Sequence, residues 1–352
     1  MAHLTGNFTS EAPLSPVVRE AISAAFEQGW ADPKKQSQAS ARAAILRDSA
    51  LSEIAAIFGT TPNRLEVIGE PSLAHFIALM GFMREGSALY TSTVDLGKIR
   101  AVARQHSAPE NEIGVDEDGL YLLGQFKAAK SSVISIQATN GETGVTQNLE
   151  RWRDHGAHVV LDATRSLISP ELLQGFATTT LDAASLGGPQ GIGFLAIGDE
   201  KQFKYPLPHL APIRVPGSYS IPLLVGSAIA LNNFITHQNQ LIHLRGVLAR
   251  ELSEIKGLTV LAGTSGAESR YLSVIAESFS SEEILRALLQ RNISVDAGSA
   301  CSPEDLTPSH VIASMGFPTT GHLRFAIHPG HTESDIHALV QILKEVLADL
   351  GS

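Results

Sequence analysis

Cys301 is the residue in this sequence whose chemistry is most reactive. It is the only cysteine among 352 residues, and it lies in a stretch of small side chains, Ala297–Ser302, that Pro303 follows. A thiol on a loop of small residues can act as a nucleophile or a sulfur carrier once it ionises. A lone cysteine is otherwise a buried and inert side chain, because free cysteines are among the most buried residue types. The residues alone leave both interpretations open.

Two charged side chains stand where a binding site would need them. Asp162 directly follows the apolar run Val159–Leu161, and a carboxylate at a strand end can stabilise the cationic ring nitrogen of a bound heterocycle. Arg324 alternates with apolar residues in 322–328, and its guanidinium can hold a ligand carboxylate by two hydrogen bonds or form a structural ion pair. Asn140–Gln147 follows another apolar run and can line the same crevice, although Asn-Gly and Thr-Gly also form ordinary turns.

The remaining clusters predict neither a metal site nor a nucleotide site. His322, His328 and His331 have no matching carboxylate or cysteine, and residues 322 and 328 lie roughly 20 Å apart in an extended strand. The glycine-rich run Ser185–Gly193 has neither the lysine of a phosphate-binding loop nor the spacing of a dinucleotide-binding motif.

The composition is that of a globular protein. Apolar residues make up 43% and charged residues 18% of the chain, and the net charge is −10 with no basic run, which argues against nucleic-acid binding. The longest apolar stretch, Ile221–Leu231, is too short to span a bilayer, and the first residues do not resemble a signal peptide. A single cysteine fits a reducing compartment. We therefore expect a cytoplasmic protein with no nucleic-acid or membrane partner.

The elements that must position these residues change in character along the chain. At first, short apolar runs such as Val133–Ile136 and Gly193–Ile197 alternate with helix-length segments. This pattern predicts an α/β fold with a mainly parallel sheet, whose ligands bind beyond the carboxyl ends of the strands. The later segments indicate a smaller α+β unit. We expect a large α/β domain over 13–249, and a small α+β domain made of 1–12 and 250–352.

Taken in order, six segments resemble the motifs of the cysteine desulfurases, which belong to the class V aminotransferase group of pyridoxal-phosphate (PLP) enzymes. The small-residue loop around Cys301 is the most specific match, and the resemblance covers nearly the whole chain. It implies a PLP-transferase fold of type I and a homodimer. The matching segments are Leu4–Pro13, Asn140–Gln147, Leu161–Ser166, Gly188–Gly193, Ala297–Ser302 with Pro308–Val311, and Leu323–Ile327.

The resemblance also implies roles for individual residues. In that family, a lysine binds PLP as a Schiff base, and a loop cysteine takes the sulfur of the substrate as a persulfide. The sulfur-accepting role maps to Cys301, and the substrate contacts map to Arg324 and Asn140. The cofactor contacts map to Asp162 as the partner of the ring nitrogen, to Thr164 and to Ser218.

The covalent and phosphate contacts of PLP depart from the family pattern. The family segment SxHKxxGPxG is shortened to Ser185–Pro189, so its lysine is missing, and Lys201 and Lys204, the nearest in sequence, lie beyond the following strand. In the phosphate-binding turn, Pro71 has no N–H and Glu70 would repel a phosphate.

The ring contacts depart from the pattern as well. Asp95 stands near the place of the ring-stacking histidine, and Gly141 and Arg165 replace an asparagine and a glutamine. These changes predict that the chain has lost PLP-dependent catalysis and has no cofactor. It would then be a sulfur-handling accessory that acts through Cys301, with a second copy, a sulfur-transfer protein or an active desulfurase as partners.

Two alternatives stay open. One is an active enzyme that binds PLP without a covalent bond or borrows a lysine from a partner. The other is a protein that binds a small anion at Arg165 and Arg324.

Overall fold

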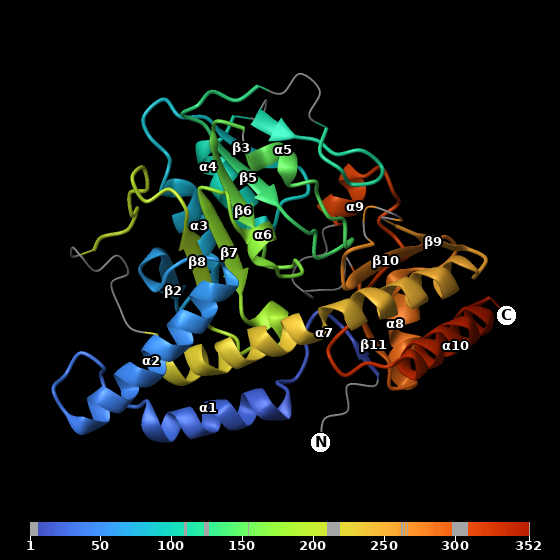
Figure 1. Cartoon of the computed structure of the whole chain (residues 1–352). Helices are drawn as coiled ribbons and strands as arrows, with labels where there is room; N and C mark the ends of the chain where they lie inside the picture. The colour runs from blue at the N-terminus through green and yellow to red at the C-terminus, as the bar shows by residue number, and fades with distance from the viewer. Residues whose placement is uncertain are drawn as a thin grey trace.

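Two β-sheets and one long helix that reaches both of them organise the molecule (Figure 1). The computed structural model describes residues 6–108, 111–122, 127–153, 155–209, 219–261, 263, 265, 267–297 and 309–351. Within these ranges, no helix combines the length and the apolar character needed to cross a membrane.

The larger sheet has seven strands and is mainly parallel, as the alternation of apolar runs and helical segments predicts. Strands β3 to β7 run parallel, whereas β8 is antiparallel to both of its neighbours. In spatial order the strands are β2 (Leu65–Ile68), β8 (Gly193–Ile197), β7 (Thr178–Asp182), β6 (His158–Asp162), β5 (Val133–Gln137), β3 (Leu89–Ser92) and β4 (Glu112–Ile113).

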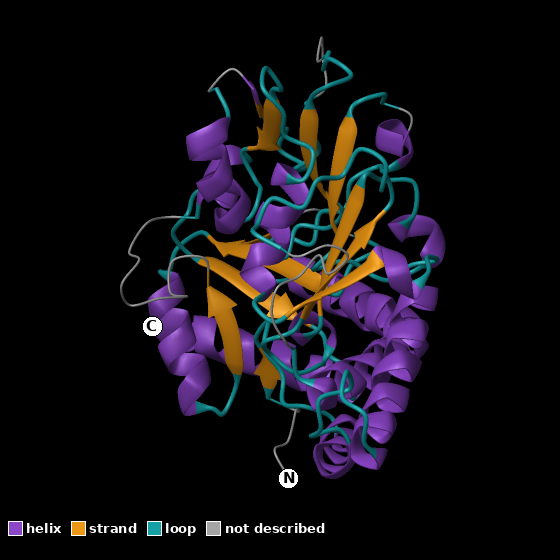
Figure 2. Cartoon of the chain, turned by 90° about the vertical axis from the view of Figure 1, so that its left-hand side faces the viewer, coloured by secondary structure: helices purple, strands orange, loops and turns teal. Residues whose placement is uncertain are grey.

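Helices cover both faces of this sheet and flank its strands in Figure 2. The side chains of β5 alternate between two apolar clusters: Val133 packs with α3 and α4, while Ile134 and Ile136 pack with α2 and α7. Full burial on both faces explains why apolar residues occupy neighbouring positions of this strand and do not alternate with exposed polar ones. The elements around the sheet are α1 (Pro16–Gln28), α2 (Gln38–Ile57), the 3₁₀ helix η1 (Pro62–Arg64), α3 (Pro71–Met80), α4 (Gly97–His106), α5 (Glu150–Arg153), α6 (Pro170–Leu173) and the 3₁₀ helix η3 (Ala184–Leu186).

The second sheet has five strands and is mostly antiparallel. Its order is β1 (Asn7–Phe8), β11 (Ser294–Ala297), β12 (His322–Ala326), β10 (Tyr271–Ala276) and β9 (Leu258–Val260). Strand β1 lies parallel to β11, so the start of the chain joins the sheet formed by its last hundred residues. The accompanying helices are α8 (Ser281–Gln290), α9 (His310–Ser314) and α10 (Glu333–Leu350).

Helix α7 (Ile221–Ser253) is the longest element of the part of the chain described here. Ser220 caps its first turn and Pro222 occupies an early position, where a missing N–H has no cost. Its 33 residues correspond to a length of about 50 Å. It packs against α1 and α2 beside the first sheet, and against α10 and β9 beside the second.

Candidate functional site

Asp162 ends β6 at the carboxyl edge of the parallel strands. Its side chain is 2% exposed, and Oδ1 accepts a hydrogen bond from the Thr164 amide at 3.0 Å. Oδ2 is buried and has no hydrogen-bond partner among the described residues. A buried carboxylate oxygen without a donor is costly. A ring N–H of a bound heterocycle would provide that donor.

A pocket of about 200 Å³ lies beside this strand end, between the beginnings of α3 and α4. His75 and Thr164 are buried polar residues in its wall, and the Thr164 Oγ1 has no partner in the described structure. Burial lowers the pKa of His75, which favours an uncharged imidazole at neutral pH. The pocket is lined by Pro71, Ala74, His75, Leu96, Gly97, Lys98, Thr164, Arg165, Leu181 and Asp182.

Lys98 and His75 are candidate site residues that the sequence motifs do not mark. Only the position of Lys98 in the sequence could have indicated it. Lys98 follows β3 after a short loop, at the carboxyl edge of the sheet, where ligands bind in such folds. Lys204 instead lines a separate surface depression with Phe203, Tyr205 and other residues.

The shortened segment Ser185–Pro189 forms a tight connection between β7 and β8. The Gly188 amide donates to the Ala183 carbonyl at 2.8 Å, and a Cβ at position 188 would lie 2.8 Å from that same oxygen. The Ser185 carbonyl accepts a hydrogen bond from Arg270 Nη2 at 2.7 Å. The segment is therefore held from both sides, and no lysine belongs to it.

Gly141 and Arg165, which replace two family residues, contact each other. A Cβ at position 141 would lie 2.6 Å from the Arg165 Cγ, so an asparagine there would collide with this arginine as placed. These two departures therefore depend on each other. Arg165 also hydrogen-bonds Tyr271, whose hydroxyl accepts from Arg270 Nη2 at 2.5 Å. Burial acts to raise the pKa of Tyr271, but the two guanidinium groups outweigh it, and the pKa is lowered.

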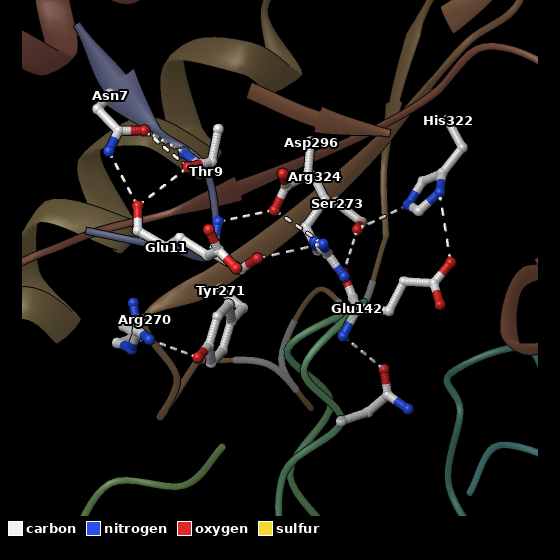
Figure 3. Close-up of polar contacts among 12 residues, drawn as sticks. Asn7, Thr9, Glu11, Glu142, Arg270, Tyr271, Ser273, Asp296, His322 and Arg324 are labelled. Atoms are coloured by element: carbon white, nitrogen blue, oxygen red, sulfur yellow. Dashed lines mark hydrogen bonds and ion pairs between the residues drawn. The ribbon is translucent and has the colours of Figure 1, made fainter. Parts of the chain in front are cut away.

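Arg324 is engaged by a carboxylate of the chain itself. It lies opposite Asp296 across β11 and β12, and Nη2 donates to Asp296 Oδ2 at 2.7 Å (Figure 3). The same oxygen accepts the Ser10 amide at 2.7 Å. Of the two alternatives for Arg324, the ion pair is present in the structure, and a role in substrate binding stays a prediction.

The side chain of Asn140 is held by hydrogen bonds within the protein. Its Nδ2 donates to the Val94 carbonyl and to Gln137 Oε1, and its Oδ1 accepts from the Glu142 and Thr143 amides. The residue is 6% exposed. Contact with a substrate would require some of these bonds to open, and that role also stays a prediction.

A buried polar cluster connects this turn to the second sheet. Ser273 Oγ donates to the Glu142 carbonyl at 2.5 Å and therefore accepts from His322 Nε2 at 2.8 Å (Figure 3). The His322 Nδ1 is left facing Glu142 Oε1 at 3.5 Å. Burial and Arg324 lower the pKa of His322 to about 3, while burial raises the pKa of Glu142. His322 is thus a neutral structural residue, and the described residues contain no metal-binding group of three such side chains.

Cys301 and Ser218 lie outside the described residues, and their predicted roles are neither supported nor opposed by the geometry. The described chain resumes at Ser309, which caps α9, and His310 Nε2 lies 3.0 Å from the Asp95 carbonyl. Asp95 is fully buried, and burial raises its pKa to about 7.

The helix end that corresponds to the phosphate-binding turn is already capped. Glu70 is the N-cap of α3, and its carboxylate accepts from the Ser72 amide at 3.1 Å and from the Ser72 hydroxyl. Pro71 contributes no N–H. Hydrogen bonds from Ser72 lower the pKa of Glu70, so this helix end carries a negative charge at neutral pH.

Comparison with known proteins places this geometry in a fold class. The chain superposes on a NifS-like protein from Rickettsia africae with a TM-score of 0.82 at 17% identity, covering 97% of this chain and 99% of the other. A cysteine desulfurase from Thermococcus onnurineus, solved in the apo form, gives a TM-score of 0.80 at 16% identity, covering 97% and 94% of the two chains. The fold is that of the type I PLP transferases.

Sequence comparisons show which proteins of this fold class the chain is similar to. Residues 216–339 match the family described as aminotransferase class-V. The chain is 26% identical to a cysteine desulfurase of Klebsiella pneumoniae over 98% of its own length and 92% of the relative. A cysteine desulfurase of a Nostoc species is 23% identical over 99% and 93%. The chain is a cysteine desulfurase-like protein.

The expectation that this protein has no cofactor is wrong. The relatives are cysteine desulfurases, which depend on PLP, so the comparisons point to use of PLP. The physical reason is that a missing lysine removes only the covalent bond. Asp162, the buried carboxylate that would pair with the ring nitrogen, is present, and its Oδ2 has no hydrogen-bond partner among the described residues.

Proposed function

We propose that this chain is a PLP-dependent sulfur transferase of the cysteine desulfurase type with an altered cofactor site, and that Cys301 takes up the sulfur. The observation that carries the proposal is the Oδ2 atom of Asp162, buried without a donor beside a pocket that Thr164 lines. The cysteine desulfurase relatives, matched over nearly their whole length, support the same function.

The residues present fit the ring of PLP. Asp162 would hold the ring nitrogen in its protonated form, and the unpartnered Thr164 Oγ1 would supply a further polar contact. When bound, PLP supplies an electron sink that acidifies the α-carbon of an amino compound. Because His75 would be neutral, it would not compete with a cationic ring for the carboxylate of Asp162.

This proposal is tested by titrating the purified chain with PLP and following the absorbance of the bound cofactor. Asp162→Asn removes the charge that pairs with the ring and is expected to raise the Kd about tenfold or more, since charge-assisted hydrogen bonds are the stronger kind. Asp116→Asn is the matched control, because Asp116 also accepts a backbone N–H in a turn, at 2.9 Å, but lies outside the pocket. Absence of PLP binding by the wild type, or equal Kd values for wild type and Asp162→Asn, would contradict the proposal.

A second candidate function is the accessory that has lost catalysis. It is favoured by the lysine-free segment Ser185–Pro189 and by the carboxylate of Glu70 at the helix end. Labelled sulfur separates the two functions. An active transferase loads Cys301 from L-cysteine when PLP is present, whereas an accessory loads it only from a second, active desulfurase. Cys301→Ser should abolish labelling in both cases.

The small-anion binder has less support. Arg324 is paired with Asp296, and Arg165 is bonded to Tyr271, so neither guanidinium stands ready for a free anion. A homodimer in the cytoplasm remains part of our proposal on the resemblance to the family. Native mass spectrometry would measure the subunit count.

A further inference from the structure

We propose that the cofactor phosphate binds at the N-terminus of α4 with Lys98, and not at the N-terminus of α3. This inference rests on the proposed PLP-dependent function. Both helices begin at the same pocket: Pro71, Ala74 and His75 come from α3, while Gly97 and Lys98 come from α4. The two helices lie next to each other against the larger sheet (Figure 1).

The two helix ends differ in what occupies them. At α3, the Glu70 carboxylate caps the first turn and Pro71 removes a donor. At α4, the N-cap is Leu96, no side chain among the described residues caps the helix, and its first turn holds no acidic residue. The first N–H groups of a helix have no partners within the helix and attract anions. The α4 end therefore offers uncapped donors to a phosphate, whereas the Glu70 carboxylate occupies the α3 end, and Lys98 is near enough to Glu70 to help the hydrogen bonds from Ser72 lower its pKa.

Lys98 provides the charge that a bare helix end lacks. It is the second residue of α4, and of the nine lysines in the chain, all in described ranges, it is the one that lines this pocket. Arg165 lines the pocket as well, on the side of Asp162. A dianionic phosphate at α4 would thus meet backbone donors and the ammonium group of Lys98, while the Arg165 guanidinium is held by Tyr271 and the Asp182 carboxylate lines another part of the pocket.

An independent observation points to a ligand at this pocket. Thr164 is 5% exposed, and its Oγ1 is buried without a hydrogen-bond partner in the described structure. It belongs to the same turn as Asp162, whose Oδ2 is also unpartnered. A molecule with a cationic ring at Asp162 and a phosphate toward Lys98 would use both of these features.

The test compares PLP with pyridoxal, which has the same ring and aldehyde but no phosphate. Equilibrium dialysis gives the Kd of each for the wild type, for Lys98→Gln and for the matched control Lys201→Gln, which alters an exposed lysine outside the pocket. We expect the wild type and the control to bind PLP about tenfold or more tightly than pyridoxal. Lys98→Gln should weaken PLP binding by a similar factor and leave pyridoxal binding unchanged. Inorganic phosphate should compete with PLP in the wild type.

Two results would overturn this site. In one, Lys98→Gln leaves the Kd of PLP unchanged, and tighter PLP binding by Glu70→Gln would then locate the phosphate at α3. In the other, Lys98→Gln weakens PLP and pyridoxal equally, in which case Lys98 acts on the ring or the aldehyde. Failure of the wild type to bind both compounds would instead contradict the proposed function.

Discussion

Replacing Asp95 by asparagine should stabilise the protein at alkaline pH and leave its stability at pH 4 almost unchanged. Asp95 is fully buried, and burial raises its pKa from 3.8 to about 7. Between these values, the folded chain holds a proton that the unfolded chain has released, so the free energy of unfolding falls as the pH rises from about 4 to 7. Above pH 7, the cost is about 4 kcal/mol, at roughly 1.36 kcal/mol per pKa unit. Asparagine removes this cost, and its amide oxygen can still accept the Ser92 amide, which lies 2.9 Å from Asp95 Oδ2.

The assay is calorimetric unfolding at pH 4 and pH 8.5. A gain of about 4 kcal/mol corresponds to a rise in Tm of about 8 °C for Asp95→Asn at pH 8.5, at about 2 °C per kcal/mol for a chain of this size. Asp118→Asn, which removes a carboxylate from an exposed turn, is the control. Equal Tm differences between variant and wild type at the two pH values would refute the assignment of a protonated, buried Asp95.

Three further outcomes are expected. Alkaline titration of the tyrosine absorbance near 295 nm should show one residue that ionises below the usual pKa of about 10. We expect this residue to be Tyr271, because Arg270 and Arg165 lower its pKa against the effect of burial. Tyr271→Phe should remove this early step of the titration curve. Arg324→Ala should lower the free energy of unfolding by about 1–3 kcal/mol, because it leaves the half-buried Asp296 carboxylate without its guanidinium partner. A change below about 0.5 kcal/mol would instead indicate that Arg324 is a charge that lines the site and contributes little to stability. Cys301 should react with a small alkylating reagent at similar rates in native and denatured protein, whereas much slower native alkylation would make it a buried structural residue.

The sheets and the position of Asp162 could be predicted from sequence because they depend on local pattern. A strand buried on both faces is a run of apolar residues, and Gly193–Ile197 forms β8 with the predicted bounds. A polar residue after such a run falls at the edge of the sheet, where the structure places Asp162. The assignment of 1–12 to the smaller domain stays a prediction, which the pairing of β1 with β11 supports.

The side-chain partners could not be predicted, because they depend on strand register and on contacts between distant segments. Asp296 and Arg324 are 28 residues apart and meet only because β11 and β12 pair in one particular register. Gly141 and Arg165 both change relative to the family pattern, and only their contact shows that the two changes belong together. The pocket lysine escapes any motif search for the same reason, since Lys98 reaches the site through the packing of α4 beside α3.

Helix α7 restricts how the two sheets can move relative to each other. One rigid rod of 33 residues packs against α1 and α2 at one end and against α10 at the other. A hinge that bends between the sheets would have to break the backbone hydrogen bonds of that rod. The chain also passes between the sheets near its start, where β1 and α1 are separated by only a short segment. Torsion about the axis of α7 is the relative motion of the two sheets that these two connections restrict least, and the pocket beside Asp162, which is lined by residues 71–182 alone, would keep its shape during that motion.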